Sequence, residues 1–312
     1  MTDIVLIEGN EPPSGLVVET IRAHDGLSLR IARASAARRR ATILLLQGRA
    51  EFIEKYFEVM RELTDRGFDV ATMDLRGQGL SGRLLNDRRK GHVGDFSDYL
   101  DDFDLMVKRI ENEGCVHPYI FLAHSTGATI ALDAMQTWPQ RFHGAILCTP
   151  FLGMGGPSPF ARFVHALAGN LDKRGYSALW ARWRDEEGGT GRTFIGNFFT
   201  SDRARFRRVK ALIAADRRLA IGAPTFGWLA AASRAFEKLK ARQPNSLHVP
   251  TLMLVAGSDR VVSRQAVENF AAHERFAHVM AIPDSRHEIM MERDELREKF
   301  WAVADAFFDR IL

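Results

Sequence analysis

The sequence predicts an α/β fold, in which a mostly parallel sheet is flanked by helices and a helical cap is inserted between two parts of the sheet domain. Three observations lead to this prediction. Strand-like and helix-like segments alternate along most of the chain, several strand-like segments are almost wholly apolar, and the alternation stops between residues 150 and 239. Strands that alternate with helices form parallel sheets buried on both faces, which accounts for the apolar runs.

The elements before the break follow from period and composition. The spacing of Phe52, Tyr56, Met60 and Leu63 predicts a helix over 52–66. Buried or alternating apolar runs predict the strands, with further amphipathic or apolar helices between them. The expected strands are 16–22, 28–34, 41–46, 68–75, 119–122 and 142–149, and the other expected helices are 96–113 and 128–138.

The pattern resumes near the C-terminus. Strands are expected at 251–256 and 278–282, with helices at 263–273 and 292–311. The interrupting segment opens with a run rich in Gly and Pro, and continues through helix-like stretches rich in Phe, Trp, Ala and Arg. We therefore expect residues 1–150 and 240–312 to form the sheet domain and residues 151–239 to form the cap.

Composition excludes several classes of protein. The chain has 312 residues, 46% of them hydrophobic, which suffices for one large core. No apolar run reaches the roughly 18 residues of a membrane span, and the first residues lack a signal-peptide pattern, so a cytoplasmic location is expected. The two cysteines, Cys115 and Cys148, have no metal-ligand spacing, so neither a disulfide scaffold nor a structural zinc site is expected.

The charge is mildly basic, at +4, and part of the arginine is clustered at 38–40 and 203–210. Such clusters usually form a solvated face, which we favour, but they also suit attraction to the phosphate head groups of a membrane surface. Nucleic-acid binding is not expected, because no recognition motif accompanies the charge and acidic residues are nearly as numerous.

The segment around Ser125 is the strongest indication of chemistry. A strand-like run ends in Ala123-His124-Ser125-Thr126-Gly127, and a helical pattern follows at once. This is the arrangement of a nucleophile elbow, in which a tight strand-to-helix turn exposes a serine hydroxyl. The alternative is that Ser125 only caps the helix, since serine is a preferred N-cap residue.

A serine nucleophile needs a base and a group that orients the base. Asp259 follows the predicted strand at 251–256, and His287 lies in a loop after the last predicted strand. The chain order Ser125, Asp259, His287 is the order that the nucleophile-elbow fold uses. We predict these three residues as a catalytic triad, with Asp284 as a lower-ranked orienting acid.

Other histidines fit the role less well. His124 adjoins the serine in sequence, but should point away from the nucleophile's side of the strand. His273 and His278 follow Asp259, yet they lie at a helix end and a strand start. The remaining histidines precede the acid.

Acyl transfer also needs donors for the oxyanion. The backbone N–H of Thr126 is one expected donor, because it follows the nucleophile directly. The second is expected from the loop after strand 41–46, where Gly48 permits an unusual backbone and the N–H of Arg49 is the candidate.

Four segments resemble the α/β-hydrolase fold, and within it the monoacylglycerol lipase and lysophospholipase L2 group. Residues 47–56 (QGRAEFIEKY) resemble that group's H-G-x-x-E-x-x-x-x-Y loop, and residues 74–82 (DLRGQGLSG) match its D-x-R-G-x-G-x-S segment. Residues 123–127 and 257–262 match its elbow and acid loop, while cap residues 196–202 and 222–228 are similar to lysophospholipase L2 relatives. Gln47 and Ala123 replace the group's His and Gly, and Gln47 is expected to hydrogen-bond within its loop.

The resemblance implies a serine hydrolase that cleaves esters of single-chain lipids, either lysophospholipids or monoacylglycerols, and needs no metal or organic cofactor. A serine at the elbow argues against a dehalogenase, which has an aspartate there. The aromatic load of the cap suits either its own core or an acyl-chain tunnel and peripheral membrane contact. These residues are Phe160, Phe163, Trp180, Trp183, Phe194, Phe198, Phe199, Phe206, Phe226 and Trp228.

Three alternatives remain open at this point. The first is a soluble short-chain carboxylesterase, and the second is a serine aminopeptidase of the same fold. The third is a non-catalytic interaction protein that keeps a relic site. The sequence itself does not select the head group, the acyl-chain length or the oligomeric state.

Overall fold

The core of the protein is one eight-stranded sheet with the strand order β1-β2-β4-β3-β5-β6-β7-β8. The computed structural model describes residues 3–155, 167–181 and 193–312. The pairs β1–β2 and β2–β4 are antiparallel, and every other pair is parallel. The strands are β1 (Val17–Arg22), β2 (Ser28–Ala34), β3 (Ala41–Leu46), β4 (Phe68–Met73), β5 (Tyr119–His124), β6 (Gly144–Cys148), β7 (Thr251–Ala256) and β8 (Ala277–Ile282). The predicted, mostly parallel sheet is confirmed.

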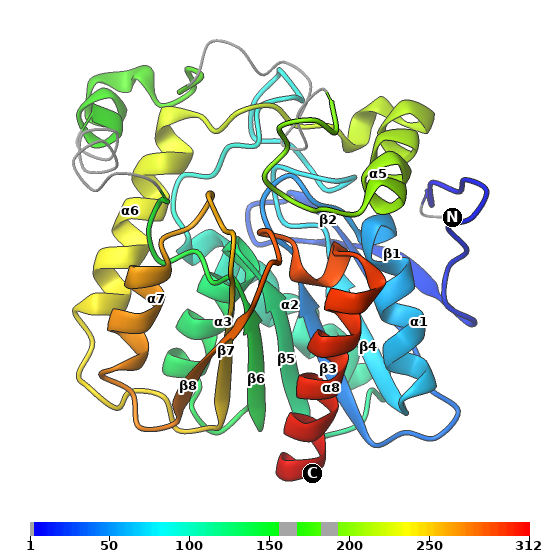
Figure 1. Ribbon diagram of the computed structural model, residues 1–312. Coiled ribbons are helices and arrows are strands. Elements are labelled where there is room, and N and C mark those ends of the chain that lie inside the picture. The colour runs from blue at the N-terminus through cyan, green and yellow to red at the C-terminus, as the bar shows by residue number, and fades with distance from the viewer. Residues whose placement is uncertain (1–2, 156–166, 182–192) are drawn as a thin grey trace.

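Helices cover both faces of this sheet (Figure 1). The described helices are α1 (Phe57–Asp65), α2 (Ser97–Asn112), α3 (Thr126–Thr137), α5 (Arg203–Ala215), which lies above the edge of the sheet, α6 (Phe226–Lys240), α7 (Arg264–Ala271) and α8 (Asp294–Ile311), with short helical segments η1 (Ile53–Tyr56), η2 (Asp172–Tyr176), η3 (Arg217–Leu219) and η4 (Ile289–Met291). Side chains of α1 and α8 pack on one face of the sheet. Those of α2, α3 and α7 pack on the other.

The two-residue period of β3 shows why the central strands read as continuous apolar runs. Ala41, Ile43 and Leu45 belong to the cluster under α1 and α8. Leu44 and Leu46 belong to the cluster under α2 and α3. Because successive side chains point to opposite faces and both faces are covered, every residue of β3 is buried.

The helix predicted over 52–66 begins differently from the prediction. Its first turn is the 3₁₀ segment η1, and α1 starts only at Phe57. Tertiary contacts hold this first turn: the N–H of Ile53 donates to the carboxylate of Asp74, and Glu54 is ion-paired with Arg30. Such contacts between distant segments leave no trace in local hydrophobic spacing.

The segment predicted as a cap contains helices and no strand among its described residues, which are 151–155, 167–181 and 193–239. The cap residues Phe160, Phe163 and Trp183 lie outside the described part. Helix α6 packs directly onto the sheet domain, since Trp228, Leu229 and Phe236 belong to the same buried cluster as α2 and α3. The division into a core and a cap at residues 151–239 stays a prediction.

The loops that follow β3, β5, β7 and β8 all leave from one edge of the sheet, because these strands are parallel. Ligands of open α/β sheets bind at this carboxyl edge. The edge therefore gathers the loop after Leu46, the turn at Ser125 and the loops that hold Asp259 and His287. Among the described helices, none combines the length and the apolar character needed to cross a membrane.

Candidate active site

Ser125 occupies a tight turn between β5 and α3. Its backbone has φ 50° and ψ −114°, a strained conformation for a residue other than glycine. A Cβ atom at Gly127 would lie 2.5 Å from the carbonyl oxygen of Leu46, so only glycine lets α3 approach the end of β3 so closely. Ser125 stands at the N-cap position, but its side chain makes no capping hydrogen bond. The hydroxyl is directed elsewhere.

The three side chains that the sequence singles out form one hydrogen-bond chain. His287 Nδ1 lies 2.9 Å from Asp259 Oδ2, and His287 Nε2 lies 3.1 Å from Ser125 Oγ. A carboxylate only accepts hydrogen bonds, so Nδ1 carries the proton and Nε2 accepts from the hydroxyl of Ser125. Ser125 and His287 are 7% and 3% exposed, which keeps the chain largely out of water.

The surroundings of Asp259 keep it ionised. Burial raises its pKa, but the hydrogen bond and charge of His287 and the N–H groups of Val261 and Val262 outweigh burial and lower it. An ionised carboxylate fixes the ring of His287 and stabilises the positive charge that the ring gains as a base.

The backbone of His287 is also fixed. Its carbonyl oxygen accepts hydrogen bonds from Thr149 Oγ1 and His124 Nε2, at 2.9 and 3.2 Å. Its N–H donates to the carbonyl of Phe198, in the segment predicted as the cap. The position of the histidine therefore depends on β6, on β5 and on the segment above the sheet edge.

The lower-ranked candidates lie apart from Ser125. Asp284 is exposed in a turn with φ 62°, and His287 pairs with Asp259 instead. His273 and His278 are exposed on the surface of the molecule.

His124 belongs to a buried charge network that the sequence alone did not reveal. Its Nδ1 lies 3.0 Å from Glu51 Oε2, and Lys55 Nζ lies 2.7 Å from both Glu51 Oε1 and Glu288 Oε1. Both ring nitrogens of His124 face acceptors, a carboxylate and the carbonyl of His287, so the ring is protonated on both. Burial alone would lower the pKa of His124, but the charge of Glu51 reverses this and raises it. The network balances two cations against two anions.

Glu51 joins this network to the loop after β3. Its Oε2 accepts hydrogen bonds from the N–H of Gly48 and from Tyr56 Oη. Burial would raise the pKa of Glu51, but the charges of His124 and Lys55 hold it well below its usual range. One carboxylate thus ties the loop after β3 to the residue before the nucleophile. Glu51 stands in the loop motif quoted above, which was the available signal for it.

The two candidate oxyanion donors make no hydrogen bond to any of the described residues. Gly48 N–H donates to Glu51 and Ala50 N–H to Gln78. Between them, the N–H of Arg49 makes no hydrogen bond among the described residues, and neither does the N–H of Thr126 at the start of α3. A Cβ at Gly48 would lie 3.2 Å from Ser125 Cβ, so this loop runs beside the nucleophile.

Gln47 behaves differently from the expectation that it hydrogen-bonds within its own loop. It is fully buried, and its Nε2 donates to Thr72 Oγ1 of β4 at 3.3 Å. The end of β3 directs this side chain toward its neighbouring strand β4, away from the loop and Ser125.

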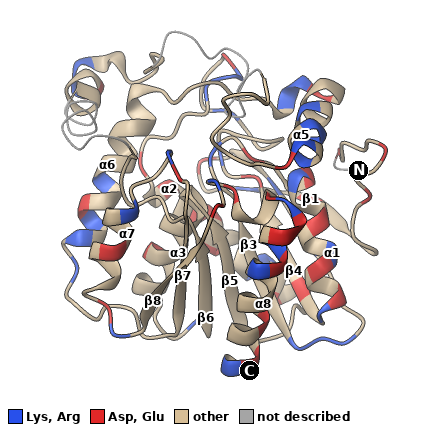
Figure 2. Cartoon of the chain, in the orientation of Figure 1, with Lys and Arg blue, Asp and Glu red and all other residues tan. Residues whose placement is uncertain are grey.

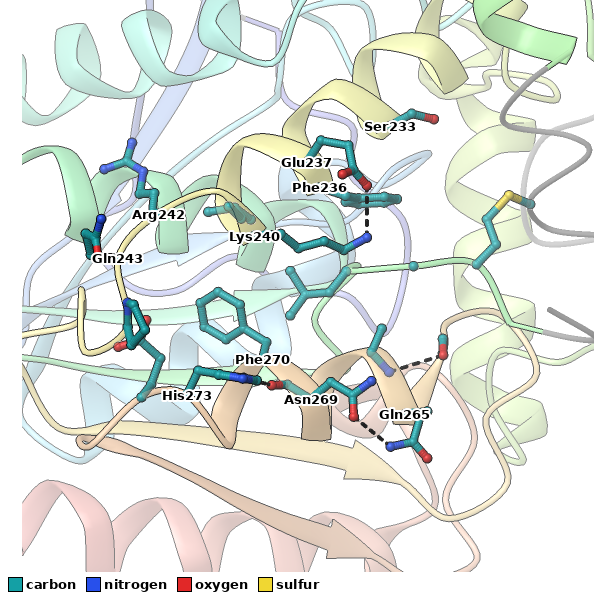
Figure 3. Close-up of a pocket in the computed structure, with 18 residues that line it drawn as sticks. Ser233, Phe236, Glu237, Lys240, Arg242, Gln243, Gln265, Asn269, Phe270 and His273 are labelled. Atoms are coloured by element: carbon teal, nitrogen blue, oxygen red, sulfur yellow. Dashed lines mark hydrogen bonds and ion pairs between the residues drawn. The ribbon is translucent and has the colours of Figure 1, made fainter.

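A cavity of about 970 Å³ lies between α6 and α7, away from the triad. Figure 3 shows Phe236 and Phe270 within a polar rim that includes Glu237, Lys240 and His273. None of Ser125, Asp259 and His287 lines it, so its size does not mark the site of chemistry. Within the described residues no group of three or more His, Cys, Asp or Glu side chains is arranged to hold a metal ion.

Some arginines of the basic cluster on α5 form ion pairs within the protein. Arg205 pairs with Glu58, Asp202 and Asp294, and Arg208 also pairs with Glu58. Figure 2 shows the basic residues of α5 and acidic residues of α1 and α8 in the same region of the molecule. Arg203 and Arg207 are exposed, and attraction of the cluster to phosphate head groups stays a prediction.

Some of the aromatic residues expected in the cap are buried, and others are exposed. Trp228 and Phe206 are buried, whereas Phe198 is 46% exposed. Phe198 lies in the segment 193–202, where Ile195 is 85% exposed. The carbonyls of Phe198 and Phe199 accept the N–H groups of His287 and Glu288, so this exposed segment rests on the histidine loop.

Comparison with known proteins agrees with this geometry. A family model described as "Serine aminopeptidase, S33" matches residues 37–294. Lysophospholipase L2 of Escherichia coli K12 is 32% identical over 92% of this chain and 85% of its own length, and a probable lysophospholipase L2 of Haemophilus influenzae is 26% identical over 86% and 84%. A soluble variant of monoglyceride lipase from Saccharomyces cerevisiae, solved with a substrate analogue, superposes with a TM-score of 0.74 at 19% identity, covering 97% of this chain and 96% of that one. The α/β-hydrolase fold is thereby confirmed.

Proposed function

We propose that this chain, which belongs to the serine aminopeptidase S33 family of α/β-hydrolases, cleaves carboxylic esters of single-chain lipids through an acyl-enzyme. Its relationship to lysophospholipase L2 supports this substrate class. The observation that carries the proposal is the unbroken hydrogen-bond chain from Asp259 through His287 to Ser125. Members of one fold family catalyse different reactions, so the chemistry rests on this site and not on the fold.

The proposed mechanism uses only residues of this chain. His287 takes the proton of Ser125 as the oxygen attacks the ester carbonyl, and Asp259 stabilises the resulting imidazolium. The free N–H groups of Arg49 and Thr126 receive the developing oxyanion. His287 then protonates the leaving alcohol, and a water molecule that His287 deprotonates releases the fatty acid from Ser125.

The substrate class rests on two supports. Relatives at 32% and 26% identity are named lysophospholipases, and a structural neighbour is a monoglyceride lipase. In addition, the segment next to the catalytic histidine exposes Ile195 and Phe198, with the guanidinium of Arg260 over the ring of Phe198. Exposed apolar side chains beside cations suit peripheral contact with a lipid surface, where single-chain lipids are found.

An aminopeptidase is the second candidate, because the matching family is described by that activity. Such an enzyme needs an acidic group that receives the amine of its substrate. Among the described residues, the buried carboxylates Glu51 and Glu288 next to the proposed triad are already bound to His124 and Lys55. Because these two carboxylates already pair with cations of the protein, they are not available to bind the amine of a peptide, which favours the esterase over the peptidase.

The test is hydrolysis by the purified protein and its Ser125→Ala variant. The substrates are p-nitrophenyl esters of increasing chain length, lysophosphatidylcholine, a monoacylglycerol and an aminoacyl p-nitroanilide. We expect release of fatty acid from the single-chain lipids that falls roughly 10⁴-fold in the variant. An unchanged circular dichroism spectrum would show that the variant folds.

Each other outcome selects one alternative. Activity confined to short esters would establish a soluble carboxylesterase, and serine-dependent release of p-nitroaniline would establish the peptidase. Equal activity of the wild type and Ser125→Ala on every substrate would refute a serine hydrolase. Failure of Ser125 to react with a fluorophosphonate would point to a non-catalytic protein.

A further inference from the structure

The side chain of Arg49 is a half-buried cation whose contacts among the described residues are with uncharged groups. Its Nη2 donates to the carbonyl of Gly222 at 2.9 Å, and its guanidinium lies 5.2 Å from the centre of the Trp228 ring. Its Nε is fully buried and has no hydrogen-bond partner. No carboxylate among the described residues forms an ion pair with it. Most of its hydrogen-bonding capacity is therefore unused.

Three other arginines that are buried or half-buried have their hydrogen-bonding groups satisfied. Arg30 pairs with Glu54 and Asp74, and Arg76 pairs with Asp102. Arg83 has no carboxylate partner either, but all three of its nitrogens donate to backbone carbonyls. Arg49 alone of these four leaves a buried nitrogen unsatisfied, which is costly unless another group arrives to accept its hydrogen bonds.

The guanidinium remains charged at neutral pH. Burial lowers the pKa of Arg49 to about 10, while the nearby Tyr99 acts in the opposite direction. Burial without a counter-charge thus leaves a protonated group that favours any anion within reach.

This cation stands beside the proposed reaction centre. The N–H of the same residue is a proposed oxyanion donor, and its loop runs past Ser125. The ring beneath the guanidinium, Trp228, stacks on Phe151 at 5.8 Å, and the N–H of Phe151 donates to the carbonyl of Ser125. Arg49 therefore bridges the nucleophile's loop cluster and the Gly222 segment above it.

We propose that the guanidinium of Arg49 binds the phosphodiester of a glycerophospholipid head group and so directs the enzyme to lysophospholipids over neutral monoacylglycerols. This inference rests on the proposed function. In such a substrate the glycerol backbone separates the acyl carbonyl from the phosphate, a span comparable to that from the Cα of arginine to its guanidinium. The oxyanion donor and the cation of Arg49 suit the two ends of this span. Arginine presents paired N–H donors that match phosphate oxygens.

The experiment compares two substrates with the same acyl chain in the same neutral detergent micelles: 1-oleoyl-lysophosphatidylglycerol and 1-oleoylglycerol. We expect Arg49→Met to lower the ratio of kcat/KM on the phospholipid to kcat/KM on the neutral lipid by roughly tenfold or more, mainly through KM. Arg49→Lys keeps the charge and is expected to recover part of the ratio. Arg234→Met serves as the matched control, because Arg234 is an exposed arginine on α6 that pairs with Asp95. It should leave the ratio unchanged.

A second measurement reads anion binding without turnover. Titration calorimetry with sn-glycerol 3-phosphate should show binding to the wild type that weakens roughly tenfold in Arg49→Met. An equal loss of kcat/KM on both lipids, or equal binding of sn-glycerol 3-phosphate by wild type and variant, would overturn the proposal and leave Arg49 as a structural support of the Gly222 segment. Absence of Ser125-dependent hydrolysis of either lipid would instead refute the proposed function, and the calorimetry would still decide the anion site.

Discussion

At the scale of single residues, the surroundings of Ser125 depend on charges that lie behind it. Lys55 is buried between Glu51 and Glu288, while Glu51 also binds His124 and the N–H of Gly48. Burial would lower the pKa of Lys55, but the two carboxylates reverse this and raise it. The lysine therefore stays charged and holds two anions that would otherwise repel each other below the proposed reaction centre.

This arrangement predicts an unequal response to two substitutions. Lys55→Met leaves Glu288 without its cation and only His124 to balance two buried carboxylates, and we expect it to lower the free energy of unfolding by about 3–5 kcal/mol at pH 7. Glu51→Gln leaves Lys55 paired with Glu288, so the expected loss is smaller, about 1–3 kcal/mol. Urea unfolding followed by tryptophan fluorescence measures both values.

The control is Lys108→Met, since Lys108 is 63% exposed and pairs with Asp104 one helical turn away on α2. Its expected cost is below about 0.5 kcal/mol. If Lys55→Met proved no more destabilising than Lys108→Met, the network would have no role in stability.

The residues that sequence reasoning found and missed differ in a physical way. Ser125, Asp259 and His287 each follow a strand in a fixed chain order, so local patterns were enough to name them. The partners of His124 and the isolation of Arg49 depend on which distant groups surround a side chain. Glu288 is 233 positions from Lys55 by chain number, yet the two side chains are in contact. No local pattern encodes such contacts.

At the scale of elements, α1, α5 and α8 meet at one carboxylate. Glu58 of α1 accepts from Arg205 and Arg208 of α5 at 2.7 Å, and from Arg297 of α8 at 3.3 Å. Burial raises the pKa of Glu58, but the hydrogen bond from Arg205, the charge of Arg297 and the hydrogen bond from Arg208 outweigh it and lower the pKa to about 2. This one group joins α5 to the sheet domain.

The lowered pKa gives a pH-dependent prediction. Because Glu58 titrates near 4.5 when unfolded and near 2 when folded, its contribution to stability is complete above pH 4.5 and is lost as the pH falls toward 2. We expect Glu58→Gln to be less stable than the wild type by about 2–3 kcal/mol at pH 7, with a gap that narrows as the pH falls below 4.5 and closes only near pH 2.

Urea midpoints of both proteins across this range provide the measurement. Glu298→Gln is the matched control, since Glu298 is an exposed glutamate on α8. A gap of constant size from pH 7 to pH 3 would contradict the role assigned to the charge of Glu58.

Elements with strong local signals were predicted to within a few residues. β2, β3 and β7 coincide with their predicted ranges; β3 and β7 are apolar runs, and β2 alternates apolar with polar residues over most of its length. The first turn of the helix at 52–66 was not predicted as 3₁₀, because Asp74 and Arg30 hold it from elsewhere in the chain. The close packing of α6 on the sheet domain was likewise invisible, since helical spacing does not say which surface a helix covers.

At the scale of the whole molecule, the parallel strands bring four separate loops to one edge, and the segment 193–202 lies on that edge. The carbonyls of Phe198 and Phe199 accept hydrogen bonds from the backbone of the histidine loop, while Ile195 is 85% exposed. Arg203 lies over the ring of Phe194, and Arg260 over that of Phe198. The exposed residues Ile195 and Phe198 form an apolar tip with flanking cations next to His287, which would place the opening of the proposed site at a negatively charged lipid surface.

Replacement of that tip should separate activity at a lipid surface from activity in solution. We expect Ile195→Ser to weaken binding to vesicles of phosphatidylglycerol and phosphatidylcholine roughly fivefold to thirtyfold, because the substitution removes about 1–2 kcal/mol of favourable burial of an apolar side chain in the lipid. Hydrolysis of lysophospholipid in these vesicles should fall by a similar factor, while hydrolysis of p-nitrophenyl acetate in solution stays near the wild-type rate. Cosedimentation at 50 mM and 500 mM salt measures the cationic share, which screening should reduce.

The matched control is Leu312→Ser, because Leu312 is 46% exposed at the C-terminus, which Figure 1 places at the opposite end of the molecule from α5, the helix that follows the segment 193–202. If both variants bound vesicles alike, the exposed tip would have no role in docking, and substrate would have to reach Ser125 from micelles or solution. If only Ile195→Ser lost binding, the segment 193–202 would contact the lipid. Because the same segment accepts a hydrogen bond from the backbone of His287, one loop would then both bind the lipid surface and position the proposed triad.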